Sequence, residues 1–120
     1  MGLAIGMVTV DCADPVGLSS FWAAALDTQV ASGNENFVVL SPPPLGGPLL
    51  AFQRVPEART GKNRLHLDLV APSGDRRAEV ERLVALGATV LGDRGDPDGF
   101  AWTTLTDPEG NEFCVGEKGL

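Results

Sequence analysis

The chain has 120 residues, with 16 acidic against 9 basic side chains and a formal net charge of -7. Its length favours one domain, and a hydrophobic fraction of 43% excludes a disordered chain. The negative charge argues against nucleic acid and anionic membrane surfaces as partners. No apolar run reaches the roughly 18 residues that span a bilayer, and no signal peptide is evident. With only two cysteines, we expect a cytoplasmic protein without a disulfide framework.

The first half of the chain predicts a strand, a helix and three further strands. Asp14 and Pro15 form a helix start, with Asp14 as the N-cap and Pro15 at the first helical position. Apolar side chains then recur at helical spacing. The proline-rich stretch 41–48 predicts a loop, because proline cannot join a sheet interior. The expected strands are 7–10, 28–32, 36–40 and 49–55, and the expected helix stripe is Leu18, Phe21, Trp22, Ala25 and Leu26.

The second half repeats this order. A strand at 64–70 precedes a helix that opens near Asp75 and stops at Gly87. We expect Val80, Leu83 and Val84 to lie on the buried side of this helix, and its charged residues to be solvated. The strands predicted to follow are 88–92, 99–106 and 111–116, with a loop at 92–99 and a turn at 107–111.

Residues 64–69 alternate strictly between polar and apolar side chains. Because successive side chains of a strand point to opposite faces, Leu65, Leu67 and Leu69 are expected to face a core. Arg64, His66 and Asp68 would then share the other face. His66 is the only histidine in the chain, which makes this face the leading candidate for chemistry. Whether Asp68 orients the imidazole stays open, since residues two apart in a strand are separated by roughly 6–7 Å.

The repeated plan and three motifs together resemble a known family. The motifs are VDCADP at 10–15 leading to Phe21 and Trp22, NRLHLDL at 63–69, and DPEGNEF at 107–113. In this order and spacing they resemble the vicinal oxygen chelate superfamily, which includes glyoxalase I, extradiol dioxygenases, and bleomycin and fosfomycin resistance proteins. The chain is most similar to the small glyoxalase-like domains, over roughly residues 3–116.

This resemblance implies an α+β fold. Two βαβββ modules, about 3–56 and 63–116, would form a curved, open barrel-like mixed sheet with the helices outside. The chain 1–120 would be a single glyoxalase-like domain, with a ligand cleft lined by the fifth and eighth strands. A homodimer is also expected, because a curved open sheet leaves edges and apolar surface to cover.

In metal-dependent members of the superfamily, a divalent ion is held by the first and last strands of each module. The second ligand position falls on Phe52 or Gln53, of which only Gln53 offers an oxygen. Thioether and neutral amide groups are weak ligands for hard divalent ions, so we expect the catalytic metal to be absent. Alternatively, His66 and Cys114 hold zinc, with Glu112 or a water completing the shell. The full set carried over onto this chain is Met7, Gln53, His66 and Cys114.

We therefore expect a glyoxalase-like protein that binds a small molecule. It either sequesters this ligand or performs acid–base chemistry with His66, whose imidazole can exchange protons near neutral pH. The alternative is a metal-dependent lyase, isomerase or dioxygenase that uses His66 and Cys114 as ligands. Phe100 and Trp102 form either an aromatic pocket wall or a packing surface. The residues expected to contact substrate are Met7, Gln53, Arg64, Asp68, Trp102, Glu112 and Cys114.

Two arginines have two readings each. Arg54 and Arg64 lie on predicted strands of the two modules. They either bind a carboxylate or phosphate of the ligand, or pair with carboxylates of the protein such as Glu57 and Asp68.

Overall fold

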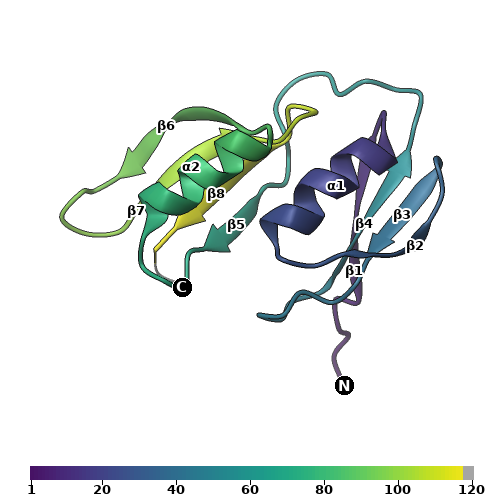
Figure 1. Ribbon diagram of the computed structural model, residues 1–120, viewed down its shortest axis with the longest axis horizontal. Coiled ribbons are helices and arrows are strands. Elements are labelled where there is room, and N and C mark those ends of the chain that lie inside the picture. The colour runs from purple at the N-terminus through teal and green to yellow at the C-terminus, as the bar shows by residue number, and fades with distance from the viewer. Residues whose placement is uncertain (118–120) are drawn as a thin grey trace. The chain divides into compact units, whose positions relative to one another are not determined.

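The computed structural model describes residues 1–117. Its elements follow the predicted order twice, strand, helix and three strands (Figure 1). The α+β class and the two βαβββ modules are therefore confirmed. In chain order the elements are β1 (Met7–Cys12), α1 (Pro15–Ala25), β2 (Val30–Gly33), β3 (Phe37–Leu40), β4 (Leu49–Arg54), β5 (Leu67–Val70), α2 (Arg76–Leu86), β6 (Thr89–Gly95), β7 (Ala101–Thr106) and β8 (Glu112–Gly116).

The chain divides into two compact units, one from Met1 to Arg59 and the other from Thr60 onward. Each unit has its own four-stranded mixed sheet, ordered β1-β4-β3-β2 in the first and β5-β8-β7-β6 in the second. In both sheets the first strand of the unit pairs parallel with the last, and the remaining pairs are antiparallel. One helix lies along one face of each sheet (Figure 1). The repeat predicted from the sequence is thus a repeat of topology.

The helix of the first unit begins where its cap residue predicts. The Asp14 carboxylate accepts a hydrogen bond from the Gly17 backbone N–H at 3.1 Å, which satisfies one of the free amides of the first turn. Leu18, Phe21 and Trp22 are buried, and α1 packs against β3 and β4. The apolar stripe of α1 therefore forms the core of this unit with Phe52, which is fully buried.

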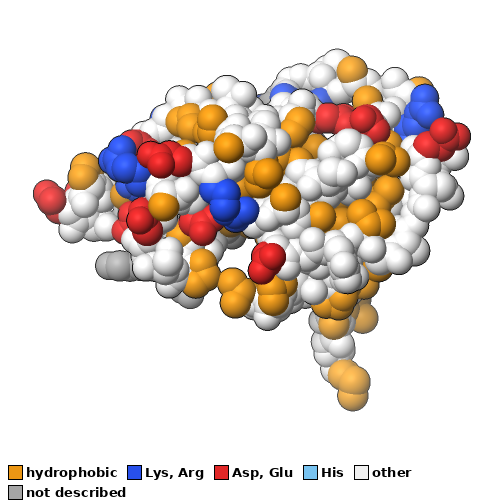
Figure 2. Space-filling model, viewed as in Figure 1, with side chains coloured by type: hydrophobic (Ala, Val, Ile, Leu, Met, Phe, Trp, Pro, Cys, Tyr) orange, Lys and Arg blue, Asp and Glu red, His pale blue; other side chains and the backbone are white. Residues whose placement is uncertain are grey.

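The helix of the second unit buries less than its sequence predicts. The Asp75 side chain caps it by accepting from the Ala78 N–H at 3.0 Å, and Gly87 ends it with a φ of 122°. Of the predicted stripe only Leu83 is buried, whereas Val84 is 45% exposed. The prediction for Val84 was wrong because one side chain per turn suffices to contact the sheet here. Basic and acidic side chains gather over α2 (Figure 2).

The strand predicted at 64–70 is shorter than expected. It begins at Leu67, and Leu65 is 70% exposed rather than in the core. At the start of β8, the Asn63 side-chain oxygen accepts the backbone N–H of Glu112 at 3.1 Å. The ladder with β8 begins at Leu67, which is opposite Phe113. The alternation therefore holds only from Leu67 onward.

β6 is longer and β7 shorter than predicted. β6 runs to Gly95 instead of ending at 92, so half of the predicted loop 92–99 belongs to a strand, and β7 begins at Ala101 instead of 99. A register shift between Val90 and Gly92 lets the strand continue past the glycine. In the first unit, the turn between β2 and β3 falls at 34–36, where the Asn34 side chain accepts a hydrogen bond from the Asn36 N–H at 2.8 Å.

Neither of the helices described within residues 1–117 is long and apolar enough to cross a membrane.

Candidate functional site

One face of the second sheet carries a cavity of about 610 Å³. This volume lies in the range of small-molecule sites, roughly 300–1,000 Å³. All of the lining residues belong to the second unit. They are Lys62, His66, Asp68, Leu69, Val70, Leu91, Arg94, Phe100, Trp102, Thr104, Glu112, Cys114 and Gly116.

Strand register explains why these side chains meet. In the parallel pair of β5 and β8, Asp68 is opposite Cys114, and in the antiparallel pair of β8 and β7, Cys114 is opposite Thr104. These residues form a polar row across the sheet. Two residues further along β5 and β8, the next row is Val70, Gly116 and Trp102. Alternation turns the intervening residues of β8, such as Phe113, toward the buried face under α2.

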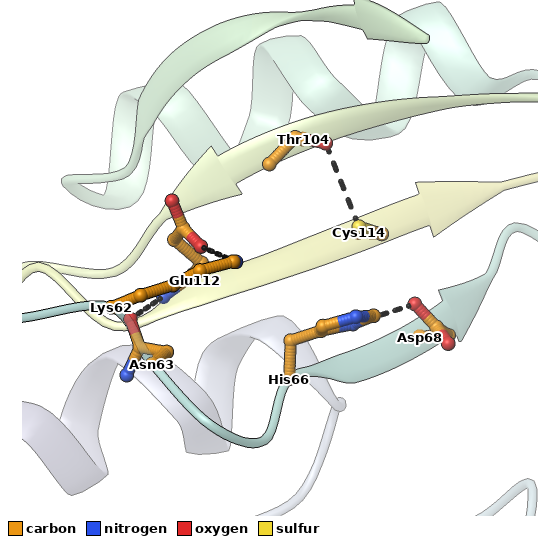
Figure 3. Close-up of polar contacts among 7 residues, drawn as sticks. All are labelled: Lys62, Asn63, His66, Asp68, Thr104, Glu112 and Cys114. Atoms are coloured by element: carbon orange, nitrogen blue, oxygen red, sulfur yellow. Dashed lines mark hydrogen bonds and ion pairs between the residues drawn. The ribbon is translucent and has the colours of Figure 1, made fainter. Parts of the chain in front are cut away.

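Three groups of different chemistry converge at the polar row (Figure 3). His66 Nδ1 lies 3.1 Å from Asp68 Oδ1, and the ligand atoms of His66, Asp68 and Cys114 all lie within 4.8 Å of one another. The histidine–aspartate contact answers the question that strand spacing left open. Because His66 precedes β5, its ring is not held in the strand and leans along it to Asp68. Asp68 thus orients the imidazole from Nδ1.

Cys114 is the buried member of this group, with 9% of its surface exposed. Burial raises the pKa of its thiol, and the nearby carboxylates of Asp68 and Glu112 raise it too, while the hydrogen bond with Thr104 lowers it. The Thr104 Oγ1 and Cys114 Sγ atoms are 3.6 Å apart. A thiol held in its neutral form is a poor nucleophile. The structure thus argues against covalent catalysis by Cys114 in the absence of a bound cation.

A second polar cluster lies at the end of the cavity where β8 begins (Figure 3). Lys62 Nζ is 3.3 Å from Glu112 Oε2, and Asn63 accepts the Glu112 backbone N–H. Lys62 is largely exposed, so this pair adds little to stability. Its effect on the site is to neutralise the charge of Glu112.

Five of the predicted site residues line this cavity: His66, Asp68, Trp102, Glu112 and Cys114. Arg64 is exposed and is not among the lining residues. The predictions for Met7 and Gln53 concern the first unit. There Met7 is opposite Leu49, whereas Gln53 is opposite Asp11, so the two are four residues out of register, roughly 13 Å along the strands. They do not form a compact donor pair within that unit.

Sequence reasoning missed Lys62, Arg94 and Thr104 as cavity residues. Thr104 could have been predicted as a cavity residue, because it has the same strand parity as Trp102. Arg94 was missed because residues 92–99 were predicted to form a loop, so Arg94 was not assigned to a face of the sheet. Phe100 and Trp102, left open between pocket and packing, both line the cavity with ring centroids 5.7 Å apart.

The family resemblance implies a divalent metal, which the donor chemistry can test. His66, Asp68 and Cys114 offer nitrogen, oxygen and sulfur, a set that suits zinc better than the hard ions Mg²⁺ or Mn²⁺. The second unit alone supplies all three donors. These residues would hold a zinc-class ion, with the Cys114 thiol giving up its proton on binding. Such an ion would act as a Lewis acid toward an oxygen of a bound molecule.

The two βαβββ units match the fold that the resemblance to the vicinal oxygen chelate superfamily implies. A family model described as "Glyoxalase-like domain" matches residues 7–116. The chain belongs to this glyoxalase-like domain family. No curated protein sequence matches it significantly.

Solved structures share the fold at low sequence identity. A glyoxalase/bleomycin resistance protein/dioxygenase family enzyme from Burkholderia phytofirmans PsJN superposes with a TM-score of 0.81 at 18% identity, over 96% of this chain and 98% of that one. A second structure is a mutant of the fosfomycin resistance protein FosX from Listeria monocytogenes, complexed with Mn(II) and a dihydroxypropylphosphonic acid. It superposes with a TM-score of 0.79 at 12% identity, over 100% of this chain and 93% of that one. A glyoxalase-related enzyme from Fulvimarina pelagi superposes with a TM-score of 0.73 at 19% identity, over 96% of this chain and 88% of that one. At such identities the likeness concerns the fold.

Proposed function

We propose that the second unit binds a small, partly apolar organic molecule in its sheet-face cavity without a catalytic metal. The cavity carries this proposal, because its polar row is followed directly by an aromatic wall of Phe100 and Trp102. A molecule with an apolar body and one polar end matches both parts. Fold alone would not support a ligand class, whereas this arrangement of side chains does.

Within this function, His66 either donates a hydrogen bond to the ligand or exchanges a proton with it. Its Nδ1 is engaged by Asp68 at 3.1 Å. An imidazole oriented through one nitrogen presents the other to a substrate, which is the arrangement that general acid–base catalysis requires. Sequestration and acid–base chemistry therefore share the same binding step and differ in what His66 does afterwards.

Binding is tested with phenylnaphthylamine, a neutral aromatic dye that brightens in apolar sites. We expect saturable binding that weakens at least about fivefold in Trp102→Ala. Trp102→Phe leaves Trp22, buried in the first unit, as the remaining tryptophan. The change in tryptophan emission on dye binding should then disappear. Dye binding that is equal in the wild type and in Trp102→Ala would rule out this cavity as the site.

The role of His66 is separated from binding by comparing affinity and turnover once a substrate is found. In an acid–base enzyme, His66→Gln should abolish turnover and retain affinity, because glutamine keeps a hydrogen-bonding side chain but cannot titrate. In a sequestering protein, the same substitution should weaken binding only modestly. Asp68→Asn should reproduce part of the catalytic effect, since Asp68 orients the imidazole.

A metal-dependent lyase, isomerase or dioxygenase is the second candidate, and the convergence of His66, Asp68 and Cys114 favours it. Elemental analysis of protein purified without chelator, before and after addition of Zn, Ni, Mn and Fe(II), tests this candidate directly. About one equivalent per chain that is lost in His66→Ala and Cys114→Ala would replace the metal-free proposal. Added Zn²⁺ should then also raise the melting temperature of the wild type but not of Cys114→Ala.

A further inference from the structure

We propose that the cavity selects organic anions, and that Arg94 binds the anionic group of the ligand. This inference rests on the proposed function, since it names the class of molecule that the cavity takes. The ligand would be an organic acid with a flat apolar body, such as an aromatic carboxylate. Two observations carry the proposal, namely the missing carboxylate partner of Arg94 and the position of its guanidinium.

Among residues 1–117, Arg94 is the one ionisable side chain lining the cavity that has no side-chain partner. Lys62 pairs with Glu112 at 3.3 Å, and His66 contacts Asp68 at 3.1 Å. Among residues 1–117 Arg94 makes no ion pair with a carboxylate, and its Nη1 donates to the backbone oxygen of Asp93 at 3.2 Å. Of the lysine and arginine side chains that line the cavity, Lys62 and Arg94, only Arg94 lacks a carboxylate partner among the described residues.

The neighbouring carboxylate on β6 is turned away from Arg94. Asp93 is opposite Thr103, whose hydroxyl donates to Asp93 Oδ1 at 2.8 Å, and Thr103 is buried. Because strand neighbours point to opposite faces, Asp93 lies on the face that carries Thr103, and Arg94 lies on the cavity face. An anion from outside the chain would therefore meet no competing carboxylate from this strand.

A glycine directs the Arg94 side chain across the sheet. A Cβ atom built on Gly92 would collide with Arg94 Nη1, so the guanidinium lies over the bare backbone of Gly92. Gly92 is opposite Thr104, which places the guanidinium beside the polar row of Thr104 and Cys114. A Cβ atom at position 92 would require Arg94 Nη1 to shift from its present place.

The residues around Arg94 determine the chemistry expected for the rest of the ligand. Arg94 is opposite Trp102, whose ring packs on Phe100, and Leu91 and Val70 complete the apolar part of the lining. The planar guanidinium offers paired N–H groups to two oxygens of one acid group, which suits a carboxylate or sulfonate. An anion held there would lay its apolar body against the aromatic wall.

The test compares two dyes that share an apolar body and differ in charge, anilinonaphthalene sulfonate and the neutral phenylnaphthylamine. Arg94→Gln should weaken the sulfonate about fivefold to tenfold and change the neutral dye less than about twofold. Gly92→Ala keeps the cation but displaces it, and should act in the same direction. The matched control is Arg77→Gln on α2, which removes the same charge from a residue outside the cavity lining and should change neither affinity.

The outcomes separate this inference from the function on which it rests. If the neutral dye binds in a Trp102-dependent manner and Arg94→Gln leaves the sulfonate unaffected, the anion proposal is overturned and the cavity function stands. An equal loss in Arg77→Gln would mean that net charge, rather than Arg94, attracts the sulfonate, which also overturns it. If neither dye binds to the folded wild type, both proposals are wrong. Circular dichroism of each variant verifies the fold.

Discussion

At the scale of single residues, the site depends on side chains whose surroundings change their chemistry. Cys114 is the clearest case, because the same thiol on an open surface would be a moderate nucleophile. Burial between β5 and β7 and the charge of Asp68 favour its protonated form. The sequence supplies the cysteine, and the sheet determines its protonation.

This raised pKa predicts a pH dependence of thiol reactivity. In a Cys12→Ala background, alkylation of Cys114 by iodoacetamide should have a midpoint above the ordinary value of 9.0. Thr104→Val should move the midpoint higher still, because the Thr104 hydrogen bond lowers the pKa. The midpoint is measured from alkylation rates between neutral and alkaline pH. A midpoint at or below 9.0 would contradict the burial argument.

The same shift affects stability with a definite sign. A group whose pKa is higher in the folded state binds its proton more tightly there, so its contribution is fully present below the unfolded value, near 9.0. That contribution is lost as the pH rises from there through the folded-state pKa. Cys114→Ala should therefore flatten the alkaline fall in the unfolding free energy measured in urea. A fall identical to that of the wild type would show that Cys114 does not contribute.

At the scale of elements, one buried carboxylate holds the turn between β7 and β8. Asp107 is 4% exposed and accepts hydrogen bonds from the backbone N–H groups of Glu109 and Asn111 and from the Asn111 amide. Because β8 carries Glu112 and Cys114, this turn also fixes the start of the strand that forms the cavity floor.

Asp107→Ala should destabilise the protein by about 2–4 kcal/mol, since several partly buried donors lose their acceptor at once. Asp96 provides the matched control in the other hairpin turn of the same sheet. It is exposed, and its Oδ1 accepts from the Asp98 N–H at 3.0 Å. Asp96→Ala should therefore cost less than about 1 kcal/mol. Urea denaturation measures both, and equal effects would contradict the special role of Asp107.

The second helix offers a comparison between two adjacent apolar residues. Leu83 is 3% exposed and Val84 is 45% exposed. Leu83→Ala should cost about 2–4 kcal/mol because it leaves a cavity against the sheet. Val84→Ala should cost less than about 1 kcal/mol, since little of the side chain is removed from water. Thermal or urea unfolding separates them, and comparable losses would mean that α2 buries a wider stripe than described.

At the scale of the whole molecule, several exposed apolar side chains favour association with another chain. Large apolar side chains that are at least 70% exposed include Leu3, Ile5, Leu45 and Leu65. Apolar atoms are also visible on the N-terminal segment (Figure 2). Leu3 and Ile5 stand close together in the segment before β1, and contiguous exposed apolar surface marks association sites. We propose that the chain forms a homodimer.

Sedimentation equilibrium should therefore report twice the chain mass of 12.5 kDa at micromolar concentration. Leu65→Asp and Ile5→Asp, tested separately, identify which apolar surface is used, because a buried charge weakens an interface strongly. A chain that sediments as a monomer across that concentration range would exclude the dimer.

The sequence by itself determined the elements and their order, because caps, turns and periodicity act over short distances. Asp14 and Asp75 start helices, Gly87 ends one, and strand parity places Glu112, Cys114 and Gly116 on one face. Together with three motifs, this was enough to identify the superfamily.

Only the tertiary structure decided which residues meet across strands. The pairing of β5 with β8 sets Asp68 beside Cys114, and an extended β6 brings Arg94 to the cavity. The ladder begins only at Leu67, and Leu65 is exposed. Register between distant strands depends on the packing of the whole sheet, which no local pattern encodes. For this reason the sequence and the family resemblance located His66, Asp68, Trp102, Glu112 and Cys114, whereas Lys62, Arg94 and Thr104 were found only in the structure.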